Sequence, residues 1–443
     1  MTRRSAAATA VCVAVCAAVC AAACTKERTG PPDVLLIVMD TTRADRCSFM
    51  GYGRPTTPHL DVLAKESVVF LETWSPSSWT VPAHASLFTG QLPFRLGVVG
   101  PRPSRMREDV PTLAELLAKA GYETGAFTCN SWIAPHSGLS RGFGTLERIY
   151  LDPGGAKAAT ATDKALGWMK ACNGAGKPYF AFINVVEPHL PWAPPAEFEK
   201  AFVRPGTRPV AVGKARAFDS PECVFAGLGV DPPDAEVVRA ASDLYDAEIA
   251  GVDDVIGKLL ASMRDADLLD HTMVVVLGDH GEGLGDHGWF EHGTYLHREL
   301  VRVPLLIRPA GGCAARTVAD LVRVEDVFPT ILDACGVPSP SALDALPLLG
   351  PPATLAGRTS LAFERTPETQ CNWIESLTDA ATAAPLRVSR ASVSDGRHQL
   401  LVDDRGGIEL FDLIADPQET RNVASENPEV VLRLRALLDA SQK

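Results

Sequence analysis

The stretch Asp-Val-Leu-Leu-Ile-Val-Met-Asp at residues 33–40 decides the fold class of this chain of 443 residues. An unbroken apolar run of this length is typical of a strand that is buried on both faces of a parallel sheet. Asp40 then stands at the carboxyl end of the predicted strand. In open α/β sheets this end is where ligands bind.

Similar apolar runs recur along the chain and alternate with helical patterns. We expect further strands at residues 122–128, 179–186, 272–277 and 303–307, and helices at 61–66, 111–121, 160–171 and onward from Asp234. The alternation continues over roughly 300 residues and predicts an α/β sandwich with a mostly parallel central sheet. A Pro/Gly-rich segment at 191–233 is expected to be a surface insertion near the substrate entrance.

The last part of the chain has a different pattern. Short alternating runs at 387–394, 398–402 and 408–411 predict a small antiparallel sheet, and a final helix is expected at 427–441. We therefore expect a larger α/β domain at residues 33–350 and a C-terminal α+β subdomain at 351–443.

Residues 1–24 are predicted to be a secretory signal. Arg3 and Arg4 precede an Ala/Val/Cys-rich run that is too short and too weakly apolar to span a membrane. The stretch 21–24 resembles a bacterial lipoprotein processing site, which predicts lipidation of Cys24. Simple cleavage into the periplasm and an uncleaved anchor are the alternatives. We expect an exported protein of the cell envelope or periplasm that contacts the membrane only through this lipid anchor.

Composition excludes several classes. With 46% apolar and 22% charged residues the chain is neither disordered nor fibrous, and a net charge of -12 argues against a nucleic-acid partner. Seven cysteines follow the leader without any Cys-x-x-Cys pair, so neither a zinc ribbon nor a disulfide scaffold is expected. We expect most of them to be small buried residues.

Three predicted strands end on groups that can hold a metal or take a proton. These groups are Asp40, the pair Glu187 and His189, and the pair Asp279 and His280. A single aspartate after a strand is usually a cap or turn residue. Three such strand ends, two of them carrying histidine, favour a ligand site at one edge of the sheet.

A second informative stretch reads SSWTVPAHASLFTG at residues 77–90. Pro82 suits the first turn of a helix and Gly90 suits a left-handed stop, so Thr80 is predicted at the N-cap. Its hydroxyl would lie at the positive end of the helix dipole, where anions bind readily. It can be an ordinary cap or a nucleophile.

The motifs together resemble the sulfatase family of the alkaline phosphatase superfamily. The matching segments are VMDTTRAD at 38–45, GY at 51–52, TTPHLD at 56–61, the Thr80 stretch, EPHLPW at 187–192, GDHGEG at 278–283 and LFDL at 410–413 with Asp416, Pro417 and Asn422. The resemblance covers nearly all of the chain after the leader. It implies a hydrolase of sulfate or phosphate esters.

The resemblance also implies roles for single residues. Asp40, Asp279 and His280 match metal ligands, and Thr80 matches the nucleophile that also touches the metal. His84 takes the place of an arginine that orients the nucleophile. His189 matches a residue that contacts the anionic group of the substrate, and His292 could protonate the leaving group. Glu187 is expected beside the substrate, and with His189 and His292 it could hold a second metal ion.

This chain departs from the family at the nucleophile. Sulfatases carry Cys or Ser there, which is oxidised to formylglycine, whereas the Cβ of Thr80 bears a methyl group and cannot give an aldehyde. Relatives with an unmodified threonine form a phospho-threonine instead. Thr41 and His280 replace a carboxylate and an asparagine of the calcium-dependent sulfatases, so one divalent ion, zinc or manganese rather than calcium, is favoured.

We therefore predict a metal-dependent hydrolase of sulfate or phosphate esters with Thr80 as its nucleophile. The substrate would be a sulfated or phosphorylated small molecule, glycan or lipid. The alternatives are a transferase that passes a phospho-headgroup to an envelope acceptor and an inactive sulfatase-like binding protein. Arg43 and Asp45 are expected to form a structural ion pair, and Asp286-His287 is expected in a loop.

Overall fold

The computed structural model describes residues 30–99, 105–218, 220–350, 355–366 and 368–441. The chain divides into two units, Met1–Pro31 and Pro32–Lys443, and all elements below belong to the second. The predicted signal and Cys24 lie outside the described residues. The predicted boundary near residue 350 stays a prediction.

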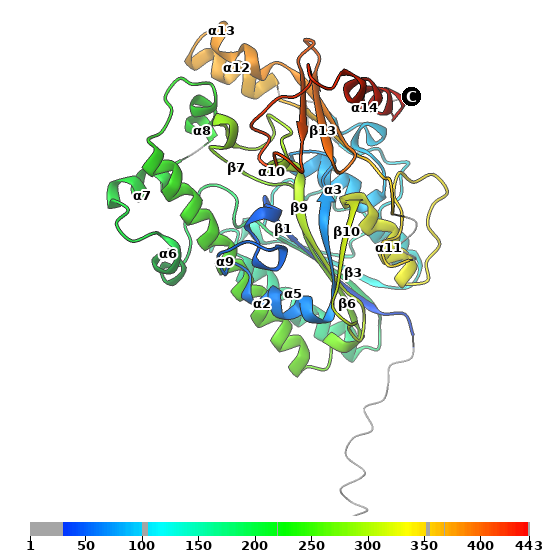
Figure 1. The fold of residues 1–443 in the computed structure, drawn as a ribbon. Helices are drawn as coiled ribbons and strands as arrows, with labels where there is room; N and C mark the ends of the chain where they lie inside the picture. The colour runs from blue at the N-terminus through cyan, green and yellow to red at the C-terminus, as the bar shows by residue number, and fades with distance from the viewer. Residues whose placement is uncertain (1–29, 100–104, 219, 351–354, 367, 442–443) are drawn as a thin grey trace, which may run out of the picture. The chain divides into compact units, whose positions relative to one another are not determined.

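An eight-stranded sheet forms the centre of this unit (Figure 1). In order across the sheet its strands are β10 (Arg316–Arg323), β2 (Val68–Trp74), β9 (Arg302–Arg308), β6 (Thr272–Gly278), β1 (Asp33–Met39), β5 (Tyr179–Val185), β3 (Glu123–Thr128) and β4 (Thr145–Arg148). Only β9 runs antiparallel to its neighbours β2 and β6, and the other neighbours pair in parallel. The predicted mostly parallel sheet is confirmed.

Helices cover both faces of the sheet, which explains why β1 is apolar at every position. Leu35, Ile37 and Met39 belong to the core on one face, and the alternating residues of β1 belong to the core on the other. The first face carries α2 (Pro58–Leu63), α5 (Ala158–Gly174) and α9 (Ala235–Asp265), and the second carries α3 (Thr80–Thr89), α4 (Leu113–Lys119) and α11 (Val327–Ala334) (Figure 1). The α/β sandwich is confirmed.

Helix α3 begins one residue earlier than predicted. Its N-cap is Trp79, which has an extended backbone, so Thr80 is the first helical residue and not the cap. The expected stop is confirmed, because Gly90 adopts φ 69° and its N–H closes the last turn on the carbonyl of Ser86. The hydroxyl of Thr80 therefore lies inside the first turn of α3.

The segment 191–233 is more ordered than expected for an insertion. It contains α6 (Ala196–Phe202), α7 (Pro209–Arg216) and α8 (Ser220–Gly227). Phe202 of α6 packs against Ala247 and Ala250 of α9. Asp234 is the N-cap residue of α9 as predicted, but its side chain makes no capping hydrogen bond.

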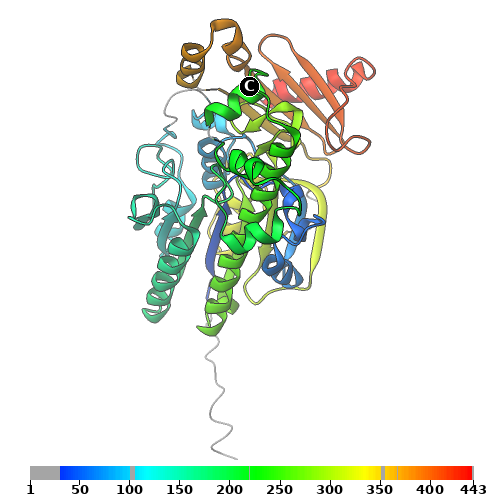
Figure 2. The ribbon, with the colours of Figure 1, turned by 90° about the vertical axis from the view of Figure 1, so that its left-hand side faces the viewer.

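The predicted antiparallel sheet is confirmed with one strand more than expected. Its order is β11 (Ser360–Arg365), β12 (Ser389–Ser394), β13 (His398–Asp403) and β14 (Ile408–Asp412), and α14 (Pro428–Ser441) packs on it through Leu434 and Leu438 (Figure 2). Further elements are a hairpin of β7 (Gly283–Leu284) and β8 (Phe290–Glu291), and the short helices α10 (Arg298–Val301), α12 (Glu368–Leu377) and α13 (Ala380–Ala383), besides several 3-10 helices.

Two further findings bear on the sequence predictions. Of the seven cysteines that follow the leader, six are buried and Cys313 is partly buried, as expected for small core residues. Across the part of the chain that the structure describes, no helix has both the length and the apolar character needed to cross a membrane.

Candidate active site

The register of two neighbouring strands brings Asp40 and Asp279 together. Met39 at the end of β1 pairs with Gly278 at the end of β6, so the residues that follow lie side by side. Thr41 adopts φ 52°, and its N–H donates to Asp279 Oδ1 at 3.1 Å. The N–H of His280 donates to the same oxygen at 2.9 Å. The sheet edge therefore fixes one oxygen of Asp279 and leaves the other available.

Three buried ligand atoms converge at this edge. Asp40 Oδ1 and Asp279 Oδ2 are buried and have no hydrogen-bond partner. His280 Nδ1 lies 3.0 Å from the carbonyl of Gly281 and donates to it, so Nε2 carries a lone pair and can act as an acceptor or a metal ligand. Nε2 lies 3.4 Å from Asp279 Oδ2 and 4.0 Å from Asp40 Oδ1.

This arrangement fits a divalent cation. Two unpaired carboxylate oxygens in a dry interior are costly without a positive partner. Burial and the charge of Asp40 raise the pKa of Asp279 well above its usual value, and burial lowers the pKa of His280. A cation would displace the proton from Asp279 and use the neutral imidazole as it stands. Carboxylate and imidazole together suit zinc or manganese.

The hydroxyl of Thr80 faces the same point. Thr80 Oγ1 lies 3.4 Å from His280 Nε2 and 3.5 Å from Asn130 Nδ2, and the residue is 2% exposed. Because Thr80 begins α3, its oxygen also lies in the first turn, where backbone N–H groups lack helical partners. The predicted nucleophile and the three predicted metal ligands are thus brought together.

His84 joins the cluster from one turn further along α3. Its Nδ1 lies 3.0 Å from the carbonyl of Thr80 and 3.4 Å from Asp279 Oδ2. The ring is fully buried and meets Phe88 and Phe182 edge-to-face. Burial lowers the pKa of His84, so the imidazole is neutral and lacks the charge of the arginine that it replaces.

His189 and His292 lie next to each other beside the cluster. Their ring centroids are 4.8 Å apart, and the ring of His292 lies 4.5 Å from that of His280. Burial lowers the pKa of His292 to about 4. Burial also disfavours the charged form of His189, but the carboxylates of Glu282 and Asp40 outweigh it and raise its pKa.

Glu187 does not join the predicted site residues. Its Oε1 accepts a hydrogen bond from the N–H of Ala158 at 3.1 Å, at the start of α5. Glu187, His189 and His292 do not form a metal-ligand group in the described part of the chain. The second metal ion is therefore not supported at these three residues.

Three residues that complete the site were not predicted. Asn130 and Asn184 donate to Asp40 Oδ2 at 2.7 and 3.2 Å. Glu282 Oε1 lies 2.9 Å from His292 Nδ1, and burial raises the pKa of this carboxyl to about 8. The sequence held two signals for these residues: Asn184 is an asparagine inside the apolar strand β5, and Glu282 belongs to the GDHGEG motif.

The sequence also matches a known protein family. The family model named "Sulfatase" matches residues 32–337. The chain belongs to the sulfatase family. It is accordingly a hydrolase of sulfate or phosphate esters.

Relatives of this sulfatase-family protein are distant but span most of its length. Arylsulfatase K of Canis lupus familiaris is 23% identical over 91% of this chain and 81% of its own length. Choline-sulfatase of Rhizobium meliloti (strain 1021) is 24% identical over 90% of this chain and 83% of its own. The phosphonate monoester hydrolase of Agrobacterium radiobacter superposes with a TM-score of 0.73 at 22% identity, covering 93% of this chain and 95% of that chain. The structural likeness shows a shared fold.

Proposed function

We propose that this sulfatase-family protein is a metal-dependent hydrolase in which Thr80 attacks a phosphate ester. The observation that carries the proposal is the position of Thr80 Oγ1, 3.4 Å from His280 Nε2 and beside the unpaired oxygens of Asp40 and Asp279. An unmodified threonine cannot supply a formylglycine hydrate. Its hydroxyl can form a covalent phospho-threonine.

Asp40, Asp279, His280 and the hydroxyl of Thr80 would hold the ion. When bound, it lowers the pKa of the hydroxyl and offsets negative charge on the transferring group. The protein's own contributions are to bury these groups and to orient Oγ1 through Asn130. The first turn of α3 adds backbone N–H groups near the developing charge.

We assign protonation of the leaving group to His189 rather than to His292 because the pKa of His189 is raised and that of His292 is lowered. Oγ1, whose own proton has passed to solvent, forms the new bond to phosphorus while the bond to the ester oxygen breaks, and this oxygen takes the proton of His189. The raised pKa of His189 keeps that proton available, whereas His292 is neutral over most of the working range. Water then attacks the phospho-threonine and returns a proton to His189.

Sulfate esters are the second candidate substrate. The names of arylsulfatase K and choline-sulfatase support them. Beside the site, Trp79 and Trp132 form an edge-to-face pair with centroids 5.5 Å apart, and Trp132 is 38% exposed. An aromatic surface next to the nucleophile suits the organic part of a small molecule, glycan or lipid ester.

The two alternative functions are less well supported. A transferase would pass the phosphoryl group from Thr80 to an acceptor hydroxyl instead of water. An inactive binding protein would have no need for two buried, unpaired carboxylate oxygens beside an imidazole nitrogen that can accept. The inactive protein is an outcome of the experiment below.

The test compares substrates and variants side by side. Metal-depleted protein is reloaded with zinc or manganese and assayed with an aryl sulfate, a phosphate monoester and a phosphodiester. Thr80→Ala is expected to lose at least about a thousandfold in kcat while bound metal stays stoichiometric. Thr80→Ser, which keeps the hydroxyl, is the matched control. Undiminished turnover in Thr80→Ala would overturn the nucleophile, and absence of both metal and turnover would favour the inactive protein.

We also propose export to the cell envelope and lipidation at Cys24. The support is the leader pattern and the lipoprotein-like stretch at residues 21–24. Labelled palmitate is expected in the wild-type protein and absent from Cys24→Ala. Label that persists in the variant would overturn the anchor.

A further inference from the structure

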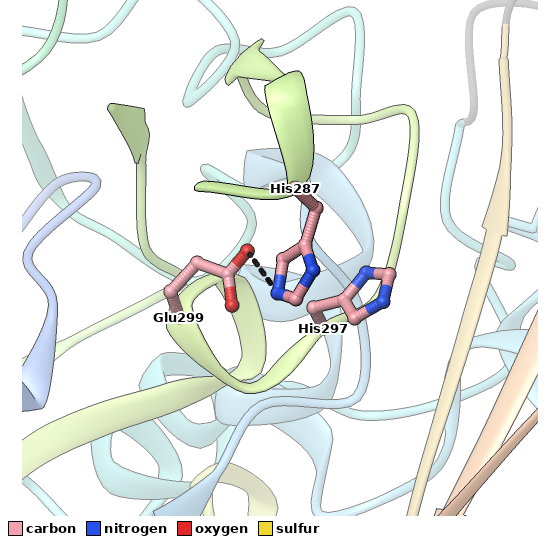
Figure 3. A group of neighbouring side chains, drawn as sticks. All are labelled: His287, His297 and Glu299. Atoms are coloured by element: carbon pink, nitrogen blue, oxygen red, sulfur yellow. Dashed lines mark ion pairs between the residues drawn. The ribbon is translucent and has the colours of Figure 1, made fainter. Parts of the chain in front are cut away.

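A second group of metal-ligating side chains lies apart from the active site. His287, His297 and Glu299 each offer a ligand atom, and these atoms all lie within 4.8 Å of one another (Figure 3). None of the three is shared with the group of Asp40, Asp279 and His280. We refer to them as the His287 cluster.

The chain holds the His287 cluster in place from two sides. His287 lies in the short turn Asp286–Gly288 between β7 and β8 and adopts φ 52°, a left-handed conformation that is costly for a residue with a Cβ. Asp286 fixes this turn, because its Oδ2 accepts from Arg43 Nη1 at 2.6 Å. His297 and Glu299 lie at the start of α10. The strained His287 thus lies opposite His297 and Glu299, at the start of α10.

The polar atoms of the His287 cluster are poorly satisfied. Glu299 Oε1 and His297 Nδ1 are buried and have no hydrogen-bond partner. Glu299 Oε1 lies 3.7 Å from His287 Nε2, which is too long for a hydrogen bond (Figure 3). The rings of His287 and His297 are stacked, with centroids 3.9 Å apart. Unpaired nitrogen and oxygen atoms that face one another call for a shared positive partner.

Neighbouring arginines do not supply that partner. Arg43 pairs with Asp45 and Asp286, as expected for a structural ion pair, and Arg298 and Arg302 both pair with Glu72. Glu419 also lies nearby: its Oε2 accepts from the N–H of Arg298, and burial together with the charge of Glu299 raises the pKa of this carboxyl well above its usual value. These arginines thus pair with other carboxylates, and the side chains nearest the carboxylate of Glu299 within the cluster are the two histidines.

Solvent reaches the His287 cluster from two cavities. One has a volume of about 750 Å³ and is lined by His287 and Glu299, and the other has about 620 Å³ and is lined by His287 and His297. An ion could therefore enter without unfolding the protein. It could also keep one coordination position open toward a cavity.

We propose that His287, His297 and Glu299 form a second metal site, which takes a first-row transition ion of the zinc class. Two imidazole nitrogens and one carboxylate oxygen are a common three-residue set for zinc with an open fourth position. Binding requires the stacked rings to tilt so that one nitrogen of each points at the ion. The site goes beyond the proposed function and does not depend on it, since it uses none of the residues that act on the ester.

The experiment counts metal ions in the full chain. Chelator-treated protein is equilibrated with zinc chloride, desalted and analysed for bound zinc, and zinc affinities are measured by calorimetry. The wild-type protein is expected to bind one ion more than His287→Ala and Glu299→Gln, or to bind that ion at least about tenfold more tightly. His59→Ala is the matched control, because His59 is an exposed histidine whose Nε2 lies 4.0 Å from Asp254.

Two further measurements separate the outcomes. Asp279→Asn removes a ligand of the other group and is expected to keep the ion of the His287 cluster, so failure of one site leaves the other measurable. Circular dichroism and the melting temperature check that each variant is folded. If Glu299→Gln does not fold, His287→Ala still tests the proposal, because His287 lies in an exposed turn. Equal zinc stoichiometry and affinity in wild type, His287→Ala and Glu299→Gln would overturn the proposal.

Discussion

Asn130 contacts both a proposed metal ligand, Asp40, and the proposed nucleophile, Thr80. Its amide donates to Asp40 Oδ2 at 2.7 Å and lies 3.5 Å from Thr80 Oγ1, so it orients a carboxylate and positions a hydroxyl at the same time. Partners that orient metal ligands contribute strongly to metal affinity and to rate.

Asn130→Asp is therefore expected to lower kcat/KM or metal affinity about 10- to 100-fold. The variant replaces a donor by a third buried carboxylate next to Asp40 and removes the contact to Thr80. Steady-state kinetics and metal titration measure the effect. Asn372→Ala, at an exposed position of α12, is the control. Unchanged kinetics and metal binding in Asn130→Asp would contradict this role.

His189 is expected to control the alkaline side of the pH profile. A general acid acts only while protonated, and the carboxylates of Glu282 and Asp40 raise the pKa of His189 against the effect of burial. The rate should fall as pH rises through this raised pKa. In His189→Asn kcat should be lower and this fall should disappear, as measured by kcat between pH 5 and 9. His292→Asn is the control, and its kcat should still fall at alkaline pH. An unchanged pH profile of kcat in His189→Asn would contradict the assignment.

The sequence predicts the residues that directly follow strands better than those that orient them. Asp40, Asp279 and His280 could be placed together because parallel strand ends share an edge. Glu187 also follows a strand, but its carboxylate accepts from Ala158 at the start of α5. Where a side chain turns after the strand depends on which donor lies nearby, and this is set by tertiary packing. Asn130 approaches Asp40 through a loop conformation that the residue pattern does not encode.

Helix α9 is held to the rest of the molecule by buried carboxylates. Asp253 accepts from the N–H groups of His59 and Leu60 at the start of α2, and Asp246 accepts from Tyr52 and Arg54. Glu248 accepts from the N–H of Ala193 at 2.6 Å in the segment that follows the active-site strand β5. The helix thus positions the loops around the site through charged groups that are costly to bury.

Glu248 makes a testable contribution to the pH dependence of stability. Burial raises its pKa to about 7, so the folded state binds this proton more tightly than the unfolded state. The free energy of unfolding should decrease as pH rises from about 4.5 to about 7, by up to about 3 kcal/mol. Glu248→Gln cannot titrate and keeps the acceptor for Ala193. It should equal the wild type at pH 4.5 and be more stable by about 1–3 kcal/mol at pH 8.5 in urea unfolding.

A control variant tests the specificity of this effect. Glu197→Gln changes an exposed residue of α6 and should leave the free energy of unfolding within about 0.5 kcal/mol at both pH values. A stability difference for Glu248→Gln that does not grow with pH would show that its burial is not the cause.

At the scale of elements, strands buried on both faces were predictable and edge strands were not. β1, β5 and β6 are buried along their whole length and read as continuous apolar runs. β10 lies at the edge of the sheet, and its first five residues are exposed or partly exposed, so its sequence mixes polar and apolar residues. The pairing of β10 with β2 depends on the rest of the sheet, so the local sequence of β10 shows only a weak strand pattern.

Across the whole molecule, the C-terminal sheet supports the approach to Thr80. Glu364 of β11 accepts from Ser77 Oγ and Ser78 Oγ at 2.9 and 3.0 Å, and the N–H of Phe363 donates to the carbonyl of Pro76. These serines immediately precede α3. The predicted C-terminal subdomain is thus in contact with the loop that carries the proposed nucleophile.

Glu364→Ala is expected to lower both stability and activity. It leaves two buried hydroxyls without their acceptor, at a cost of about 1–3 kcal/mol for each unsatisfied group, and frees the loop before Thr80. Urea unfolding and kcat are the measurements, with an expected tenfold loss in kcat. Glu364→Gln keeps an acceptor oxygen and should retain most of both. Wild-type stability and kcat in Glu364→Ala would contradict the proposed support.

The register of β1 and β6 also bears on how the molecule folds. Asp279 and the N–H of Thr41 that fixes it are 238 positions apart in the chain, so their meeting closes a very large loop. Such long-range pairings are slow to form. The group of Asp40, Asp279 and His280 therefore exists only when β1 and β6 have paired. Metal bound there would report this pairing.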